Sequence, residues 1–191
     1  MKPLRQFIVH IPQKFKDEIK LTEDTTLKLV TKFNEFENRV NLGKIVSCPA
    51  GFTNRNGDTL YFHHHVVLEQ KYDIGDDLYL VDYDSNGGYG NHAIAIEDEA
   101  GDITMLGDWC FVAPPPKAEE ETTSSGIILG LPEKPKEEGQ LLHMPEGSEW
   151  IGASAGDLVG YRPNSEYEME LLDGSKAYRM RTTELVYVKE A

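Results

Sequence analysis

The chain repeats itself, and this repetition constrains its fold more than any other feature. Residues 3–12 and 105–114 are β-rich runs that each end in proline, a residue that cannot donate to a strand ladder. A polar loop and two further matching stretches follow each run. These stretches are residues 43–51 with 139–147 and residues 57–62 with 156–161. Because the features recur in the same order, we interpret the chain as two copies of one unit.

Most of the remaining sequence has the pattern of short strands. Runs such as residues 78–81, 93–96, 167–171 and 184–188 are separated by glycine, proline, asparagine and aspartate. This pattern predicts an all-β fold, with a small barrel or sandwich in each half. The Asp-Gly pair within residues 172–175 predicts a hairpin turn, in which both residues supply positive φ angles. We expect two domains, at residues 1–103 and 104–191.

One segment of the first half has a different periodicity. Leu29, Phe33, Phe36 and Val40 are spaced at i, i+4, i+7 and i+11, which is helical spacing. A short helix over residues 26–40 is one interpretation, with a threonine as its N-cap. A long irregular loop and an added strand are the alternatives.

Charge and composition exclude several classes of function. The net charge is −14 and both halves are acidic, so the chain repels phosphate backbones and we expect no nucleic-acid partner. No apolar run approaches the roughly 20 residues that span a bilayer, and the N-terminus carries no visible secretory signal. Two cysteines are too few for a disulfide scaffold or a four-cysteine zinc site. We therefore expect a cytoplasmic protein without a membrane partner.

A short apolar plug stands out in the second half. Ile127, Ile128 and Leu129 lie between Gly126 and Gly130, within a loop of prolines, acidic residues, threonines and serines. Such a plug is either a short buried strand or an anchor for another protein. The polar flanks keep the free loop solvated, and the two glycines let the chain turn around the plug. These flanks favour the anchor.

The second half resembles the GroES-type co-chaperonins, the lids of cage-forming chaperonins. Residues 106–112 resemble the opening strand of that family, and residues 125–129 resemble its mobile loop. Residues 137–142, 156–161 and 178–189 resemble the strands that follow. The resemblance covers nearly all of residues 105–191, and the ordered set of motifs is more specific than any one of them.

The first half resembles the same unit more faintly. Its opening strand and two glycine-containing stretches match, but its loop has no Gly-Ile-Ile-Leu equivalent. Ile19 and Leu21 are the nearest candidates for contact residues, with a lysine between them. In both halves the stretch where the family usually has a roof hairpin is short, at residues 52–56 and 148–155. Some phage-encoded co-chaperonins resemble this truncated version.

The resemblance implies a fold and a function. The fold would be two tandem GroES-like small β-barrels, each with a long loop after the first strand, and the mobile loop would span residues 115–138. Gly126, Ile127, Ile128, Leu129 and Gly130 would contact a GroEL-type chaperonin ring. The protein would form a homo-oligomeric ring, expected to be a heptamer, and would close the folding chamber over non-native client proteins. It would not be an enzyme and would carry no cofactor, and it would work in the host cytoplasm if phage-encoded.

The energetics of the plug require several copies to act together. Burying the three aliphatic side chains stabilises a complex by about 1.5–3 kcal/mol each. Ordering roughly eight loop residues costs about 1–2 kcal/mol per residue, so one loop is expected to bind very weakly. Several loops on one ring gain about 10²–10⁴-fold in avidity. A structural or adaptor ring that no longer binds chaperonin is the alternative function.

Other motifs are weaker. Residues 88–93 fit a dinucleotide-binding glycine pattern, but no strand–helix–strand unit surrounds them, and a glycine-rich hairpin tip is the preferred interpretation. Histidines at 63, 64 and 65 suggest a metal site, because on a strand the first and third share one face. Spacing identifies no further ligand, so we expect no metal site. We find no catalytic constellation.

Overall fold

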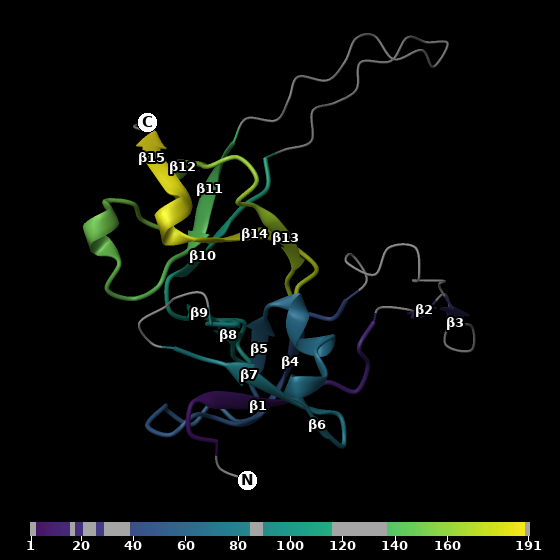
Figure 1. Cartoon of the computed structure of the whole chain (residues 1–191). Coiled ribbons are helices and arrows are strands. Elements are labelled where there is room, and N and C mark those ends of the chain that lie inside the picture. Colours follow the sequence, from purple (N-terminus) through teal and green to yellow (C-terminus); the bar gives the residue numbers. More distant parts are fainter. Residues whose placement is uncertain are drawn as a thin grey trace, which may run out of the picture. The chain divides into compact units, whose positions relative to one another are not determined.

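The computed structural model describes residues 3–15, 18–20, 26–28, 39–84, 90–115 and 137–189. The fold is all-β, with two large antiparallel sheets and short 3-10 helices (Figure 1). The chain divides into two compact units, Met1–Gly107 (unit 1) and Asp108–Ala191 (unit 2). The division falls a few residues after position 103, because β9 (Ile103–Met105) pairs with β8 (Ala93–Glu97) of unit 1. No helix in the described ranges has the length and apolar character needed to cross a membrane.

Unit 1 contains one seven-stranded antiparallel sheet in the order β6-β7-β1-β4-β5-β8-β9. Its other strands are β1 (Gln6–His10), β4 (Leu42–Ser47), β5 (Thr59–Phe62), β6 (Asp73–Gly75) and β7 (Leu78–Asp82). The 3-10 helices η2 (His64–Val67) and η3 (Gln70–Tyr72) lie between β5 and β6. A separate hairpin pairs β2 (Glu18–Lys20) with β3 (Thr26–Lys28).

Unit 2 contains a six-stranded antiparallel sheet in the order β13-β14-β10-β11-β12-β15. Its strands are β10 (Trp109–Val112), β11 (Glu138–His143), β12 (Leu158–Tyr161), β13 (Tyr167–Glu170), β14 (Lys176–Arg181) and β15 (Leu185–Lys189). The 3-10 helices η4 (Glu149–Ile151) and η5 (Thr182–Glu184) lie in connections between strands.

The two sheets have the same topology. Taken in chain order, β1, β4, β5, β6, β7 and β8 occupy the same sheet positions as β10 to β15. The register also shifts at the same place, between Ile8 and Val9 in unit 1 and between Phe111 and Val112 in unit 2. Among the described residues, unit 1 adds the β2–β3 hairpin and β9 to this shared set. A bulge bends its strand and increases the twist, so both sheets bend at the same strand.

Each unit has its own hydrophobic core. The core of unit 1 includes Phe7, Leu60 and Val81, and the smaller core of unit 2 includes Val112, Leu141 and Val159. In β4 and β11 buried residues alternate with exposed or half-buried ones, as in a strand with one face on a core. The expected closed barrels are not found, because no pairing among the described residues joins the outer strands of either sheet.

The expected helix over residues 26–40 is wrong at both ends. Residues 26–28 form β3, and Arg39 forms an isolated β-bridge with Phe15. Residues 29–38 lie outside the described residues. At both described ends, β-pairing replaces the helix interpretation, and at residues 26–28 a strand is present, as the alternative of an added strand had it.

Two of the turn predictions also need correction. The hairpin tip expected at residues 88–93 would join two paired strands, but β7 before it pairs with β1 and β8 after it pairs with β5. The connection from β7 to β8 therefore passes β1, β4 and β5, which lie between these two strands in the sheet. The β13–β14 hairpin does turn at Asp173-Gly174, but only Gly174 has a positive φ. Asp173 contributes differently, because its Oδ1 accepts a hydrogen bond from Ser175 N–H at 2.8 Å.

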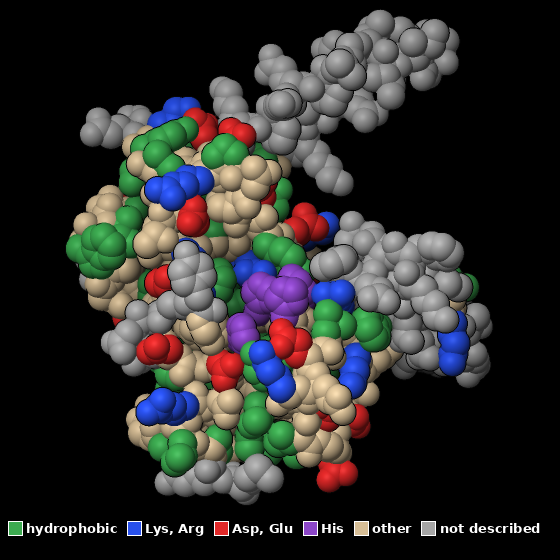
Figure 2. Space-filling model, in the orientation of Figure 1, with side chains coloured by type: hydrophobic (Ala, Val, Ile, Leu, Met, Phe, Trp, Pro, Cys, Tyr) green, Lys and Arg blue, Asp and Glu red, His purple; other side chains and the backbone are tan. Residues whose placement is uncertain are grey.

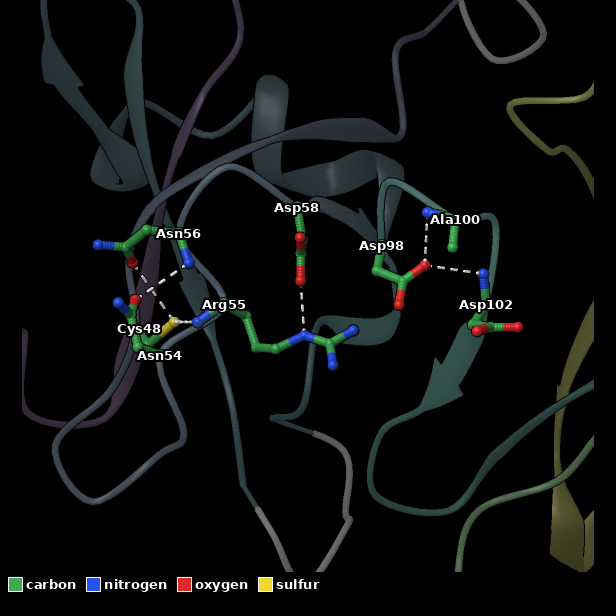
Figure 3. A network of polar contacts seen from close by, with 8 residues as sticks. All are labelled: Cys48, Asn54, Arg55, Asn56, Asp58, Asp98, Ala100 and Asp102. Atoms are coloured by element: carbon green, nitrogen blue, oxygen red, sulfur yellow. Dashed lines mark hydrogen bonds and ion pairs between the residues drawn. The ribbon is translucent and has the colours of Figure 1, made fainter.

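The connection between β4 and β5 contains no strand, and polar contacts hold it (Figure 3). Cys48 Sγ accepts a hydrogen bond from Arg55 N–H at 3.3 Å and donates to Asn56 Oδ1 at 3.6 Å. Arg55 Nε forms an ion pair with Asp58 Oδ2 at 2.6 Å. This connection includes residues 52–56, the short stretch where the resemblance would place a roof hairpin.

Candidate functional site

The predicted contact residues Gly126, Ile127, Ile128, Leu129 and Gly130 lie outside the described residues. What the structure does describe is the pair of strands that flank this segment, β10 before it and β11 after it. We call these two strands the stem. The stem therefore brackets the predicted contact residues in the sequence.

The two strands of the stem, β10 and β11, approach each other closely at Gly139. Val112 pairs with Leu141, and Ala113 N–H donates to Gln140 C=O at 2.7 Å. A Cβ atom added to Gly139 would lie 2.4 Å from the Ala113 carbonyl oxygen. Only glycine fits here, because the backbone of the neighbouring strand occupies the space that a Cβ atom would need. Gly139 is therefore required for the strands to meet at the base of the contact segment.

Glu138 ties the stem to the last strand of the unit. Tyr187 Oη donates to Glu138 Oε1 at 2.8 Å, and Lys189 Nζ lies 3.4 Å from Glu138 Oε2. The hydrogen bond to Glu138 raises the pKa of Tyr187. The Tyr187 ring also covers Gly160, where an added Cβ would lie 2.2 Å from the ring. β15 thus supports the stem from the far side of β12.

The corresponding loop of unit 1 begins and ends differently. Val40 N–H donates to Lys14 C=O at 3.1 Å beside the Phe15–Arg39 bridge. Of the weaker candidates, Ile19 lies in β2 and pairs with Leu27 across the hairpin. Leu21 lies outside the described residues. Ile19 is thus part of a hairpin, which the sequence did not indicate.

The outer strand β15 exposes apolar side chains. Val186 is 59% exposed and Tyr187 48% exposed, and Val188 is also exposed. β15 pairs with β12 on one side, and β13 is the outer strand at the other end of the same sheet. An unpaired outer strand is a template for pairing with another chain.

Sequence reasoning missed a stack of arginines and aromatic rings in unit 2. The Arg179 guanidinium carbon lies 4.2 Å from the Tyr167 ring centroid and 5.1 Å from that of Trp109. Arg181 lies over the same Trp109 ring and forms an ion pair with Asp108. Burial lowers the pKa of Arg179 to about 10. The sequence signal for this stack was the spacing of Arg179 and Arg181, which are two residues apart on one strand and therefore share a face.

The three neighbouring histidines form a cluster, in a geometry different from the one expected. β5 ends at Phe62 and η2 begins at His64, so the alternating faces of a strand do not apply. The ring centroids of His63, His64 and His65 lie 4.3–4.5 Å from one another. His64 is buried, His63 half-buried and His65 exposed.

A fourth histidine lies beside this cluster. The ring centroid of His92 is 6.0 Å from that of His63, and its Nδ1 is 3.6 Å from Asp82 Oδ2. Burial lowers the pKa of His92, and the Asp82 carboxylate opposes that shift. Four of the six histidines in the chain therefore lie together at one place in unit 1.

No protein-family model matches the chain, and a search of curated proteins returns no match.

Proposed function

We propose that the protein is a tandem GroES-like co-chaperonin, a lid that caps a GroEL-type chaperonin ring and closes its folding chamber. Its contact residues would be Gly126 to Gly130, with the three aliphatic side chains docking in an apolar groove of the partner. The protein would perform no chemistry, and it would hold non-native client proteins only indirectly. This function would take place in the cytoplasm.

The observation that carries the proposal is the matched topology of the two units. Six strands follow the same order in each, and a long connection follows the first strand of each. In unit 2 that connection holds the aliphatic triplet, which has polar and glycine neighbours on both sides. A short apolar motif between two paired strands is suited to docking by an extended segment.

The proposed contact requires a ring, and the outer strands of unit 2 support one. A single loop binds too weakly because ordering it offsets the burial of three side chains. β13 and β15 lie at opposite ends of the sheet, and β15 exposes apolar side chains. A head-to-tail contact between such edges closes into a ring if the rotation is right. We propose a homo-oligomeric ring of seven chains.

A structural or adaptor ring without chaperonin binding is the second candidate function. Two observations favour it over a lid: the sheets are open, and the first loop carries the β2–β3 hairpin where a docking segment would be. Under the lid proposal this hairpin carries Ile19, one of the two weaker candidate contact residues, and the main contact belongs to unit 2.

Measuring assembly mass tests the lid against the adaptor. The untagged protein is analysed by native mass spectrometry or analytical ultracentrifugation, alone and with a GroEL-type chaperonin plus nucleotide. The lid proposal predicts a ring that joins the chaperonin only when nucleotide is present. A ring that never joins the chaperonin supports the adaptor, and a monomer contradicts both.

A further inference from the structure

We propose that His63, His64 and His65 form a binding site for a divalent transition-metal ion in unit 1. This inference is independent of the proposed lid function, since the cluster lies on a different unit from the aliphatic triplet. Three features support the site: the short distances between the ligand atoms, the backbone that holds them, and the types of side chain around them.

The ligand atoms are close enough for one ion. One ligand atom from each histidine lies within 4.8 Å of the others. A tetrahedral zinc ion with Zn–N distances of about 2.0–2.1 Å places its ligand nitrogens about 3.4 Å apart. The largest gap must therefore shorten by at most about 1.4 Å. The rings now stack, so binding requires them to tilt about their side-chain torsions, while the backbone already brings them together.

Hydrogen bonds on both sides hold this backbone. His63 N–H donates to His92 C=O at 2.9 Å, which joins the end of β5 to the start of β8. Val66 N–H donates to His63 C=O and Leu68 N–H to His65 C=O, each at 3.1 Å. His63 is extended, with φ −68° and ψ 132°, and the tight turn starts directly after it. This change of conformation brings three consecutive side chains to one place.

Two carboxylates lie near the cluster, and both already have partners. The Glu69 carboxylate lies within electrostatic range of His65 and His92, and Lys71 Nζ contacts it at 2.6 Å. Asp82 lies beside His92. Figure 2 shows the histidine side chains as one patch with acidic and basic side chains beside it. His65 is exposed, so a coordination position can remain open to water.

Three imidazoles select the class of ion. Imidazole suits zinc, copper, iron and nickel, whereas carboxylate and carbonyl oxygens suit magnesium and calcium. The cluster offers three nitrogens, whereas the carboxylates of Glu69 and Asp82 are paired with Lys71 and His92. We therefore expect zinc-like ions to bind and magnesium or calcium to compete poorly.

Cobalt(II) and zinc(II) titrations of the untagged full-length protein, after removal of metal with a chelator, test the site. The expected result is one ion per chain, with visible cobalt bands typical of nitrogen ligands and with zinc displacing the cobalt. His65→Asn and His63→Asn should each weaken binding at least about tenfold, since even outer-shell partners change affinity by about 10–100-fold. His10→Asn is the matched control, because His10 is exposed on β1 and far from the cluster in sequence.

Each outcome decides the proposal. Far-UV circular dichroism first checks that both cluster variants fold, and His65 is suited to this because it is exposed. Cobalt binding that is equal in the wild type and in a His63→Asn/His65→Asn variant overturns the site, as does a loss of binding in His10→Asn. Since the cluster variants keep the aliphatic triplet, chaperonin capping by these variants reports separately on the lid function.

Discussion

Ile45 and Leu141 make the same pair of backbone hydrogen bonds, each within its own unit. Each residue donates its N–H to the carbonyl oxygen of an aspartate and accepts a hydrogen bond from the glycine that precedes that aspartate. The partners are Asp58 (2.9 Å) and Gly57 (2.8 Å) for Ile45, and Asp157 (2.8 Å) and Gly156 (2.7 Å) for Leu141. Both glycines have a positive φ, of 94° and 98°, which glycine adopts without a steric cost. The same Gly-Asp turn is therefore hydrogen-bonded to a corresponding core residue in each unit.

Leu141→Ala tests how far unit 2 depends on this core residue. Leu141 is fully buried, and removing a buried leucine side chain leaves a cavity that costs about 2–5 kcal/mol. We expect the free energy of unfolding of unit 2 to fall by that amount. Urea denaturation followed by tryptophan fluorescence measures it, because both tryptophans, Trp109 and Trp150, lie in unit 2.

Ile45→Ala is the matched control for that measurement. Ile45 occupies the corresponding position in the core of unit 1, which contains no tryptophan. The variant should shift the unfolding transition seen by far-UV circular dichroism and leave the tryptophan transition in place. An equal shift of the tryptophan transition by both variants would contradict two separate cores.

Gly139→Ala tests the close approach at the base of the contact segment. The new Cβ would meet the Ala113 carbonyl oxygen at 2.4 Å, a backbone atom that cannot swing away. We expect a loss of about 1–3 kcal/mol, the usual cost of overpacking. Gly43→Ala should cost less, because its nearest neighbours lie at 3.0 Å. Urea denaturation of both variants checks the ranking, and a stabilised Gly139→Ala would contradict the stem geometry.

Asp73→Asn tests an acid-sensitive contact in unit 1. The carboxylate accepts hydrogen bonds from Gly75 N–H at 3.0 Å and Lys14 Nζ at 3.1 Å, and from Tyr79 Oη at 3.3 Å. The bonds from Gly75 and then Lys14 lower the pKa of Asp73 below 3.8. A lowered pKa stabilises the fold above the unfolded-state value, and this contribution is lost as the pH falls through the folded-state value.

The wild type should therefore be more stable than Asp73→Asn at pH 7, and the difference should narrow below about pH 4, near the ordinary pKa of an aspartate. Chemical denaturation of the two proteins at pH 7 and below about pH 4 measures this difference in the free energy of unfolding. A difference that is the same at both pH values would show that the carboxylate charge does not contribute.

Much of the fold follows from short-range signals in the sequence. Short apolar runs between turn residues predict strands that the structure contains, such as β7, β8 and β13, and the two proline-ended runs contain β1 and β10. The helical spacing extends the interpretation too far at its two described ends, because Thr26–Lys28 and Arg39 pair as strand and bridge residues. Sheet closure is set by pairings between distant strands, which a pattern of individual strands does not specify.

The candidate sites are less predictable than the strands. The histidine triplet is obvious in the sequence, but its geometry depends on β5 ending at Phe62. His92 joins the cluster only because the start of β8 lies beside the end of β5. Gly139 gives no signal of its own, since its role comes from the backbone of a strand distant in the sequence.

Charged replacements in the aliphatic triplet test the central proposal most directly. Capping of a GroEL-type chaperonin in the presence of nucleotide is measured by co-sedimentation for the wild type and for an Ile127→Asp/Ile128→Asp/Leu129→Asp variant. The variant's ring mass and tryptophan unfolding transition serve as controls for assembly and folding. We predict that the variant still assembles and no longer joins the chaperonin. A variant that caps the chaperonin as well as the wild type does would contradict the proposal.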